Sequence, residues 1–137
     1  MPQYSLVRQE KRSVVKKLKS NKENLKLNKL AIITYQDYMK NIYKSHQGDQ
    51  GLFMKLVEEV GEVAQVLNIK EGRKQADINI DEALSQELAD IIHYAFAIAS
   101  INNIDLESVI LEKDKSASLK YGRTENLINY IQKEKTK

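Results

Sequence analysis

The sequence contains no cysteine, and it has only one proline and five glycines in 137 residues. Without cysteine, the chain can form neither a disulfide framework nor a thiolate metal site, and it has no cysteine nucleophile. Because proline and glycine both interrupt helices, their scarcity favours a helical protein. The length suits one domain with its own hydrophobic core.

The sequence also lacks a hydrophobic run long enough to cross a bilayer. Its longest apolar stretch, residues 88–101, is too short for a membrane span and contains Asp90 and His93. The N-terminus is basic, but it has no apolar segment of the kind that a signal peptide requires. We therefore expect a cytoplasmic protein with no membrane partner.

Positive charge is concentrated at the N-terminus. Residues 1–30 hold nine Lys/Arg and two Asp/Glu, whereas residues 31–137 hold thirteen Lys/Arg and seventeen Asp/Glu. We interpret residues 1–30 as a basic N-terminal extension and residues 31–137 as the folded domain. The extension has a single aromatic residue, Tyr4, so it lacks the mixture of basic and aromatic side chains that binds nucleic acid strands. Nucleic acid is therefore not favoured as a partner, although a basic arm can contact other anions.

Apolar residues recur with helical spacing through most of residues 31–137, and no segment alternates with a period of two. We expect an all-α fold of about five helices. The first three are predicted at residues 34–44, 52–69 and 82–100. A fourth begins after Asp105 and ends near Lys120, and a short last helix begins at Thr124. Asp81 and Asp105 are predicted as N-caps, and Gly122 as a left-handed helix stop.

The third predicted helix is apolar on almost all sides, so we expect it to be buried on most of them. A chain of this size has too little surface to cover such a helix alone, and this predicts a homo-oligomer in which the core helices pack together. On the second predicted helix, the residues expected on the core side are Phe53, Leu56, Val57, Val60, Val63, Ala64 and Leu67.

Four carboxylates are the most informative feature of the chain. Glu59 and Glu62 are three residues apart on the second predicted helix, and Glu87 and Asp90 are three apart on the third. Each pair is therefore separated by roughly 60° around its helix, beside apolar residues. If the two helices pack antiparallel, the pairs can face each other. Carboxylate oxygens without His or Cys suit a hard cation, Mg²⁺ or Mn²⁺.

The same residues have a simpler interpretation as an acidic surface, or as carboxylates paired with lysines of neighbouring helices. On that interpretation the protein is a helical interaction or regulatory module with a non-catalytic acid cluster. Its basic N-terminal arm would contact nucleic acid or a protein partner.

The acidic residues also form a family signature. The run Glu58, Glu59, Val60, Gly61, Glu62, followed after a loop by Glu87, Leu88, Ala89, Asp90, resembles the EExxE and ExxD motifs of the MazG-like all-α nucleotide pyrophosphohydrolases. The similarity covers roughly residues 50–123. It implies Mg²⁺-dependent cleavage of nucleoside triphosphates between the α and β phosphates, giving a monophosphate and pyrophosphate. It also implies assembly into homodimers or homotetramers.

By motif position, the resemblance implies that Glu59, Glu62, Glu87 and Asp90 are the metal ligands. Glu58, the first acid of the motif, would orient or deprotonate the attacking water. Relatives carry a lysine on the fourth helix, an asparagine four residues later and a basic residue three further on. Lys113 and Lys120 match this pattern, but Ala117 replaces the asparagine. The residues expected to bind the substrate's phosphates are Lys55, Lys113 and Lys120.

Overall fold

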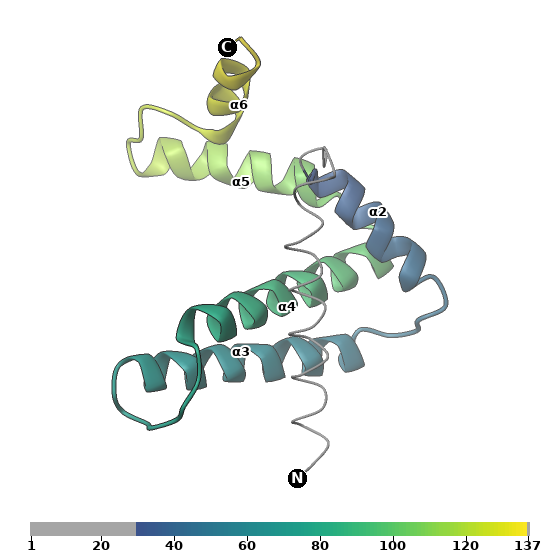
Figure 1. The fold of residues 1–137 in the computed structure, drawn as a ribbon. Helices are drawn as coiled ribbons and strands as arrows, with labels where there is room; N and C mark the ends of the chain where they lie inside the picture. The colour runs from purple at the N-terminus through teal and green to yellow at the C-terminus, as the bar shows by residue number, and fades with distance from the viewer. Residues whose placement is uncertain (1–29, 137) are drawn as a thin grey trace, which may run out of the picture. The chain divides into compact units, whose positions relative to one another are not determined.

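The computed structural model describes residues 30–136, and all of these except Leu30 belong to the compact unit Ala31–Lys137 (Figure 1). Within it lie five helices and, among the described residues, no strand, which confirms the all-α prediction. The helices are α2 (Ile32–Ile42), α3 (Gln50–Lys70), α4 (Ile80–Ile101), α5 (Leu106–Lys120) and α6 (Leu127–Lys135). The predicted basic extension, residues 1–30, lies outside the described residues except for Leu30. No helix in the described part of the chain has the length and apolar character needed to cross a membrane.

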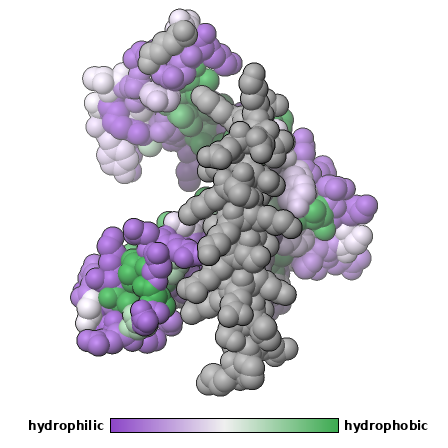
Figure 2. Space-filling view, viewed as in Figure 1, coloured by the Kyte–Doolittle hydropathy of each residue, from purple (hydrophilic) through white to green (hydrophobic). Residues whose placement is uncertain are grey.

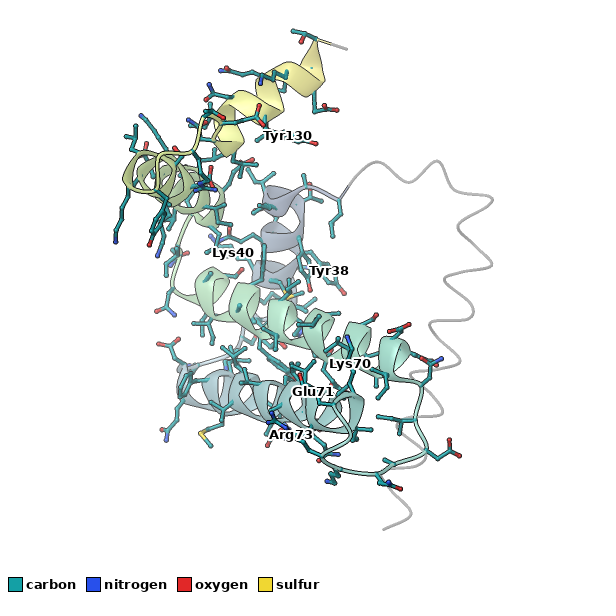
Figure 3. The ribbon with its side chains drawn as sticks, turned by 90° about the vertical axis from the view of Figure 1, so that its left-hand side faces the viewer. Tyr38, Lys40, Lys70, Glu71, Arg73 and Tyr130 are labelled. Carbon is teal, nitrogen blue, oxygen red and sulfur yellow. The ribbon has the colours of Figure 1, made fainter. Side chains whose placement is uncertain are left out.

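Helices α3 and α4 form an antiparallel hairpin, and α2 packs on α4, so that α4 lies between α2 and α3 (Figures 1 and 3). The core of this arrangement consists of Met39, Leu52 and Ala97, from three different helices. Tyr35, Phe96 and other partly buried apolar residues pack around it. Helix α5 packs against α2 and α6.

Gln36 joins α2 to the turn between α4 and α5. Its side-chain nitrogen donates to the Ile104 carbonyl, and its side-chain oxygen accepts from the Leu106 backbone at 3.2 Å. The Ser100 hydroxyl donates to the Gln36 carbonyl at 3.1 Å. These bonds connect α2 to the end of α4 through Ser100 and to the first backbone N–H of α5 through Leu106, so they hold three helices at one point.

The helix ends agree with the sequence at some positions and differ at others. Asp105 caps α5 as predicted, and the hydrogen bonds from Ser108 lower the pKa of the Asp105 carboxyl. Gly122 ends α5 with a φ of 62°, also as predicted. The predicted cap Asp81 is wrong, because Asn79 caps α4 by accepting from the Glu82 backbone at 3.1 Å. An amide oxygen two residues earlier serves the same purpose.

The last helix also begins later than predicted. Asn126 caps α6, and the helix begins at Leu127, so the predicted start at Thr124 is wrong. Asp114 of α5 explains the shift, because its carboxylate accepts from the Leu127 backbone at 2.6 Å and pairs with Arg123 at 3.2 Å. A tertiary contact therefore decides where this helix starts.

Candidate metal centre

The hairpin of α3 and α4 brings three carboxylates together. Glu59 comes from α3, and Glu87 and Asp90 come from α4. One ligand oxygen from each residue lies within 4.8 Å of the other two. Glu59 is only 9% exposed and Glu87 only 7% exposed. This convergence of acids inside a helical core is the main feature of the site.

The helical repeat explains why these acids are buried. Leu52, Glu59 and Val66 are the buried residues of α3, and they follow one another at seven-residue intervals. On α4, Glu87 and Tyr94 lie at the same interval. Residues seven apart occupy nearly the same side of a helix, the side that packs on a neighbour. Each glutamate therefore occupies a position where an apolar core residue would ordinarily lie.

Like charges buried together are costly unless a cation compensates them. Oxygens on opposite sides of an octahedral Mg²⁺ would be about 4.2 Å apart, which is close to the observed 4.8 Å spread. The Oε2 atoms of Glu59 and Glu87 are shielded from solvent. An all-carboxylate donor set suits Mg²⁺ or Mn²⁺ better than a softer metal. The residues present therefore fit a hard divalent cation.

Two further acids of the motif lie outside this triad. Glu62 is on α3, one turn beyond Glu59, and it is exposed. Glu58 is also exposed, and its Oε2 lies 2.6 Å from the Nζ of Lys55. The hydrogen bond from Lys55 to Glu58 is the main cause that raises the pKa of Lys55. The predicted water-activating acid and one predicted phosphate-binding residue thus form an exposed ion pair beside the triad.

The other two predicted phosphate-binding residues are farther along the chain, on α5. Lys113 and Lys120 are exposed and line a shallow hollow together with Ala117 and Tyr121. Lys120 Nζ lies 5.3 Å from the centre of the Tyr121 ring. Helix α5 packs against α2 and α6, and α4 lies between α5 and α3 (Figures 1 and 3). One protomer does not bring these lysines to the triad.

Aromatic side chains lie beside the triad on the side of α2. The hydroxyl of Tyr43 lies 2.7 Å from the Nε2 of His93, and the His93 ring packs at steep angles, 68° and 81°, against the rings of Tyr43 and Tyr94. Burial is the main cause that raises the pKa of Tyr94, followed by the nearby Tyr43 and Glu59. Tyr94 was not singled out from the sequence as a site residue. Its seven-residue spacing from Glu87 is the signal that places it on the same side of α4.

His93 predicts how stability depends on pH. Burial lowers the pKa of His93 below its ordinary value of 6.5, although Asp90 opposes the shift. His93 therefore binds a proton more readily in the unfolded chain than in the folded protein. The contribution of His93 to the free energy of unfolding is therefore fully present above pH 6.5, and it declines as the pH falls below that value. We expect the metal-free protein to be less stable in urea at about pH 5.5 than at about pH 7.5.

His93→Phe keeps an aromatic ring between Tyr43 and Tyr94 but removes the titrating group. Its stability should decline less over the same pH interval than that of the wild type. His46→Gln, which alters the other histidine of the chain, should retain the wild-type decline. Equal pH dependence in wild type and His93→Phe would contradict this assignment.

The comparison with known families agrees with the site. The family of the MazG nucleotide pyrophosphohydrolase domain matches residues 47–117, which include all of α3 and α4 and most of α5. No curated protein and no solved structure matches the chain. The match covers more than half of the sequence and includes every acid of the candidate metal centre. The chain therefore belongs to the MazG nucleotide pyrophosphohydrolase domain family.

Proposed function

We propose that this protein is a Mg²⁺-dependent nucleoside triphosphate pyrophosphohydrolase. It cleaves an NTP or dNTP between the α and β phosphates and releases the monophosphate and pyrophosphate. The observation that carries the proposal is the convergence of Glu59, Glu87 and Asp90 inside the hairpin that the family match covers. Mn²⁺ is an alternative cation, because it accepts the same oxygen ligands.

Glu59, Glu87 and Asp90 would hold the cation, and Glu62 would complete the ligand set from the exposed side of α3. When bound, the cation would neutralise phosphate charge and lower the pKa of a coordinated water. The ligands lie on two packed helices, so their separation is held by the scaffold rather than by a loop. This rigidity supports a role in positioning the reacting groups.

Glu58 would orient the attacking water and take its proton. The water oxygen forms the new P–O bond, the bond between the α and β phosphates breaks, and pyrophosphate leaves with the electron pair. Lys55 pairs with Glu58 in the protein without substrate, and it would contact the incoming phosphates. Because α5 packs away from α3, we propose that Lys113 and Lys120 contact phosphates from a neighbouring copy. The assembly would then be a homodimer or homotetramer, and its nucleotide substrate favours the cytoplasm.

A panel of canonical NTPs and dNTPs tests this function. Pyrophosphate release should require Mg²⁺ or Mn²⁺, should stop when EDTA is added, and should be faster for some bases or sugars than for others. A full-length protein that releases no pyrophosphate from any nucleotide with either metal would contradict the proposal. Nucleic-acid binding that disappears when residues 1–30 are deleted would then support the interaction module.

A further inference from the structure

Asp90 is the least buried acid of the triad. Glu59 and Glu87 are buried, whereas Asp90 is only partly buried. A partly exposed carboxylate can turn towards solvent unless its neighbours restrict its orientation. Burial and then the charge of Asp90 raise the pKa of Tyr35, a residue of α2, so α2 lies on this side of the triad. The side chains between α2 and α4 therefore decide how well Asp90 is positioned.

His93 is the side chain placed to cover Asp90. Side chains of a helix lean towards its N-terminus, so the His93 ring lies over the turn of α4 that contains Asp90. Burial lowers the pKa of His93 and the charge of Asp90 opposes this shift, which agrees with the placement. A ring held at this position limits the orientations of the Asp90 carboxylate and excludes water from one side of it.

Tyr43 fixes the orientation of that ring. Its hydroxyl lies 2.7 Å from the Nε2 of His93, and burial raises the pKa of Tyr43, so the hydroxyl keeps its proton. A phenol is a stronger acid than the N–H of a neutral imidazole, and the unprotonated imidazole nitrogen is the stronger base. The Tyr43 hydroxyl therefore donates to Nε2, which places the ring hydrogen of His93 on Nδ1.

Tyr43 also anchors the C-terminal end of α2. Within residues 40–49, which contain the end of α2 and the loop before α3, every residue except Tyr43 is exposed. The surface over this part of the molecule is largely hydrophilic (Figure 2), so apolar burial contributes little to holding it. A second hydrogen bond between α2 and α4, from the Ser100 hydroxyl to the Gln36 carbonyl, lies seven residues away on each helix. The Tyr43–His93 bond is the one beside the triad.

We propose that Tyr43 and His93 form a positioning pair for Asp90, and that their hydrogen bond holds the Asp90 carboxylate in the orientation that binds the divalent cation. Neither residue of the pair is a ligand, because Tyr43 acts on the His93 ring and the ring acts on Asp90. The inference rests on the metal centre of the proposed function, but it does not depend on nucleotide hydrolysis. Removal of such an outer partner typically weakens metal binding by roughly 10–100-fold.

Calorimetric titration of Mn²⁺ into the full-length, nucleotide-free protein tests the pair. Tyr43→Phe removes only the hydroxyl and should raise the dissociation constant of Mn²⁺ about 10-fold. Ser100→Ala is the matched control, because it also removes one hydroxyl and one hydrogen bond between α2 and α4. It should lose a similar amount of thermal stability but bind Mn²⁺ as the wild type does. Equal losses of affinity in both variants would overturn the proposal, because general loosening of α2 would then explain them.

Substitutions of His93 provide a second test. His93→Phe should weaken Mn²⁺ binding at least as much as Tyr43→Phe, and combining the two should cause no further loss, because both break the same bond. His93→Gln should recover part of the affinity, since its amide oxygen can accept from the Tyr43 hydroxyl. If His93→Phe does not fold, the comparison of Tyr43→Phe with Ser100→Ala decides.

The tautomer of His93 provides a third test that a purely structural role would not predict. Long-range ¹H–¹⁵N NMR of the metal-free protein at about pH 7.5 should show the ring hydrogen on Nδ1. The chain has only two histidines, so a His46→Gln sample identifies the signals of His93. A ring hydrogen on Nε2 would overturn the proposal.

The metal titrations also separate this inference from the proposed function. Wild-type affinity for Mn²⁺ in both Tyr43→Phe and His93→Phe would overturn the positioning pair and leave the metal centre standing. A wild type that binds no Mn²⁺ would overturn both. If Mn²⁺ binding depends on the pair but no nucleotide is hydrolysed, the pair stands and only the proposed activity fails.

Discussion

Glu59→Gln is expected to reduce Mg²⁺-dependent pyrophosphate release by more than about 100-fold, a larger loss than removal of an outer-shell partner usually causes. The substitution keeps the size of the side chain but replaces a charged oxygen ligand with a neutral amide. Glu59 is buried between α3 and α4, so the charge of its carboxylate is not replaced when the side chain becomes an amide. The remaining acids, Glu87 and Asp90, would hold a divalent cation more weakly.

The activity of Glu59→Gln should be measured with the best nucleotide of the panel over a range of Mg²⁺ concentrations. Glu71→Gln is the matched control, because Glu71 is exposed at the loop end of α3 beside Lys70 and Arg73 (Figure 3). The ion pair between Glu71 and Arg73, at 3.4 Å, is exposed to solvent and contributes little to stability. Full activity in Glu59→Gln would show that Glu59 is not a metal ligand. Equal losses of activity in both variants would indicate a general defect in folding or stability.

Glu87→Gln is expected to have opposite effects on stability with and without metal. Three carboxylates lie within 4.8 Å of one another, so replacing one of them with an amide relieves repulsion in the metal-free protein. The thermal midpoint of the variant in EDTA should therefore exceed that of the wild type. Mg²⁺ at 100 times its dissociation constant should stabilise the wild type by about 2.7 kcal/mol, and this gain should be absent from the variant.

Thermal unfolding followed by circular dichroism, with EDTA or with increasing Mg²⁺, measures both effects. Ca²⁺ at matched ionic strength separates specific Mg²⁺ binding from general screening. Asp77→Asn is a suitable control, since it neutralises an exposed acid in the loop between α3 and α4. It should leave the Mg²⁺ response intact. A Glu87→Gln protein that gains as much stability from Mg²⁺ as the wild type would contradict the assignment of Glu87 as a ligand.

The helices themselves could be predicted because their signals are local. Apolar spacing and the scarcity of proline and glycine place α3 and α4 within two residues of their observed ends. Asp105 begins α5 and Gly122 ends it, and both act through neighbours close in the sequence, so these roles can be predicted from the sequence. The start of α6 was missed because Asp114, thirteen residues earlier, determines it through a tertiary contact.

The orientation of α3 was harder to predict, because this helix has two apolar stripes. One stripe contains Leu52 and Val66 and packs on α4, and the other contains Phe53, Val57 and Val60 and is exposed. Periodicity alone favours the stripe with more apolar residues. The glutamate between Leu52 and Val66 made the buried stripe look less apolar than it is. The buried glutamate of the site is therefore the reason why the buried face of α3 was predicted incorrectly.

The sequence alone determined that the protein is helical, where its long helices lie, and that two of them carry acids one turn apart. These properties depend on spacing within single helices, which the helical repeat sets. Only the tertiary structure decided that Glu59, Glu87 and Asp90 converge while Glu62 stays exposed, and that Lys113 and Lys120 lie away from them in one protomer. Convergence depends on how each helix is rotated against its neighbours, and packing of distant residues sets that rotation.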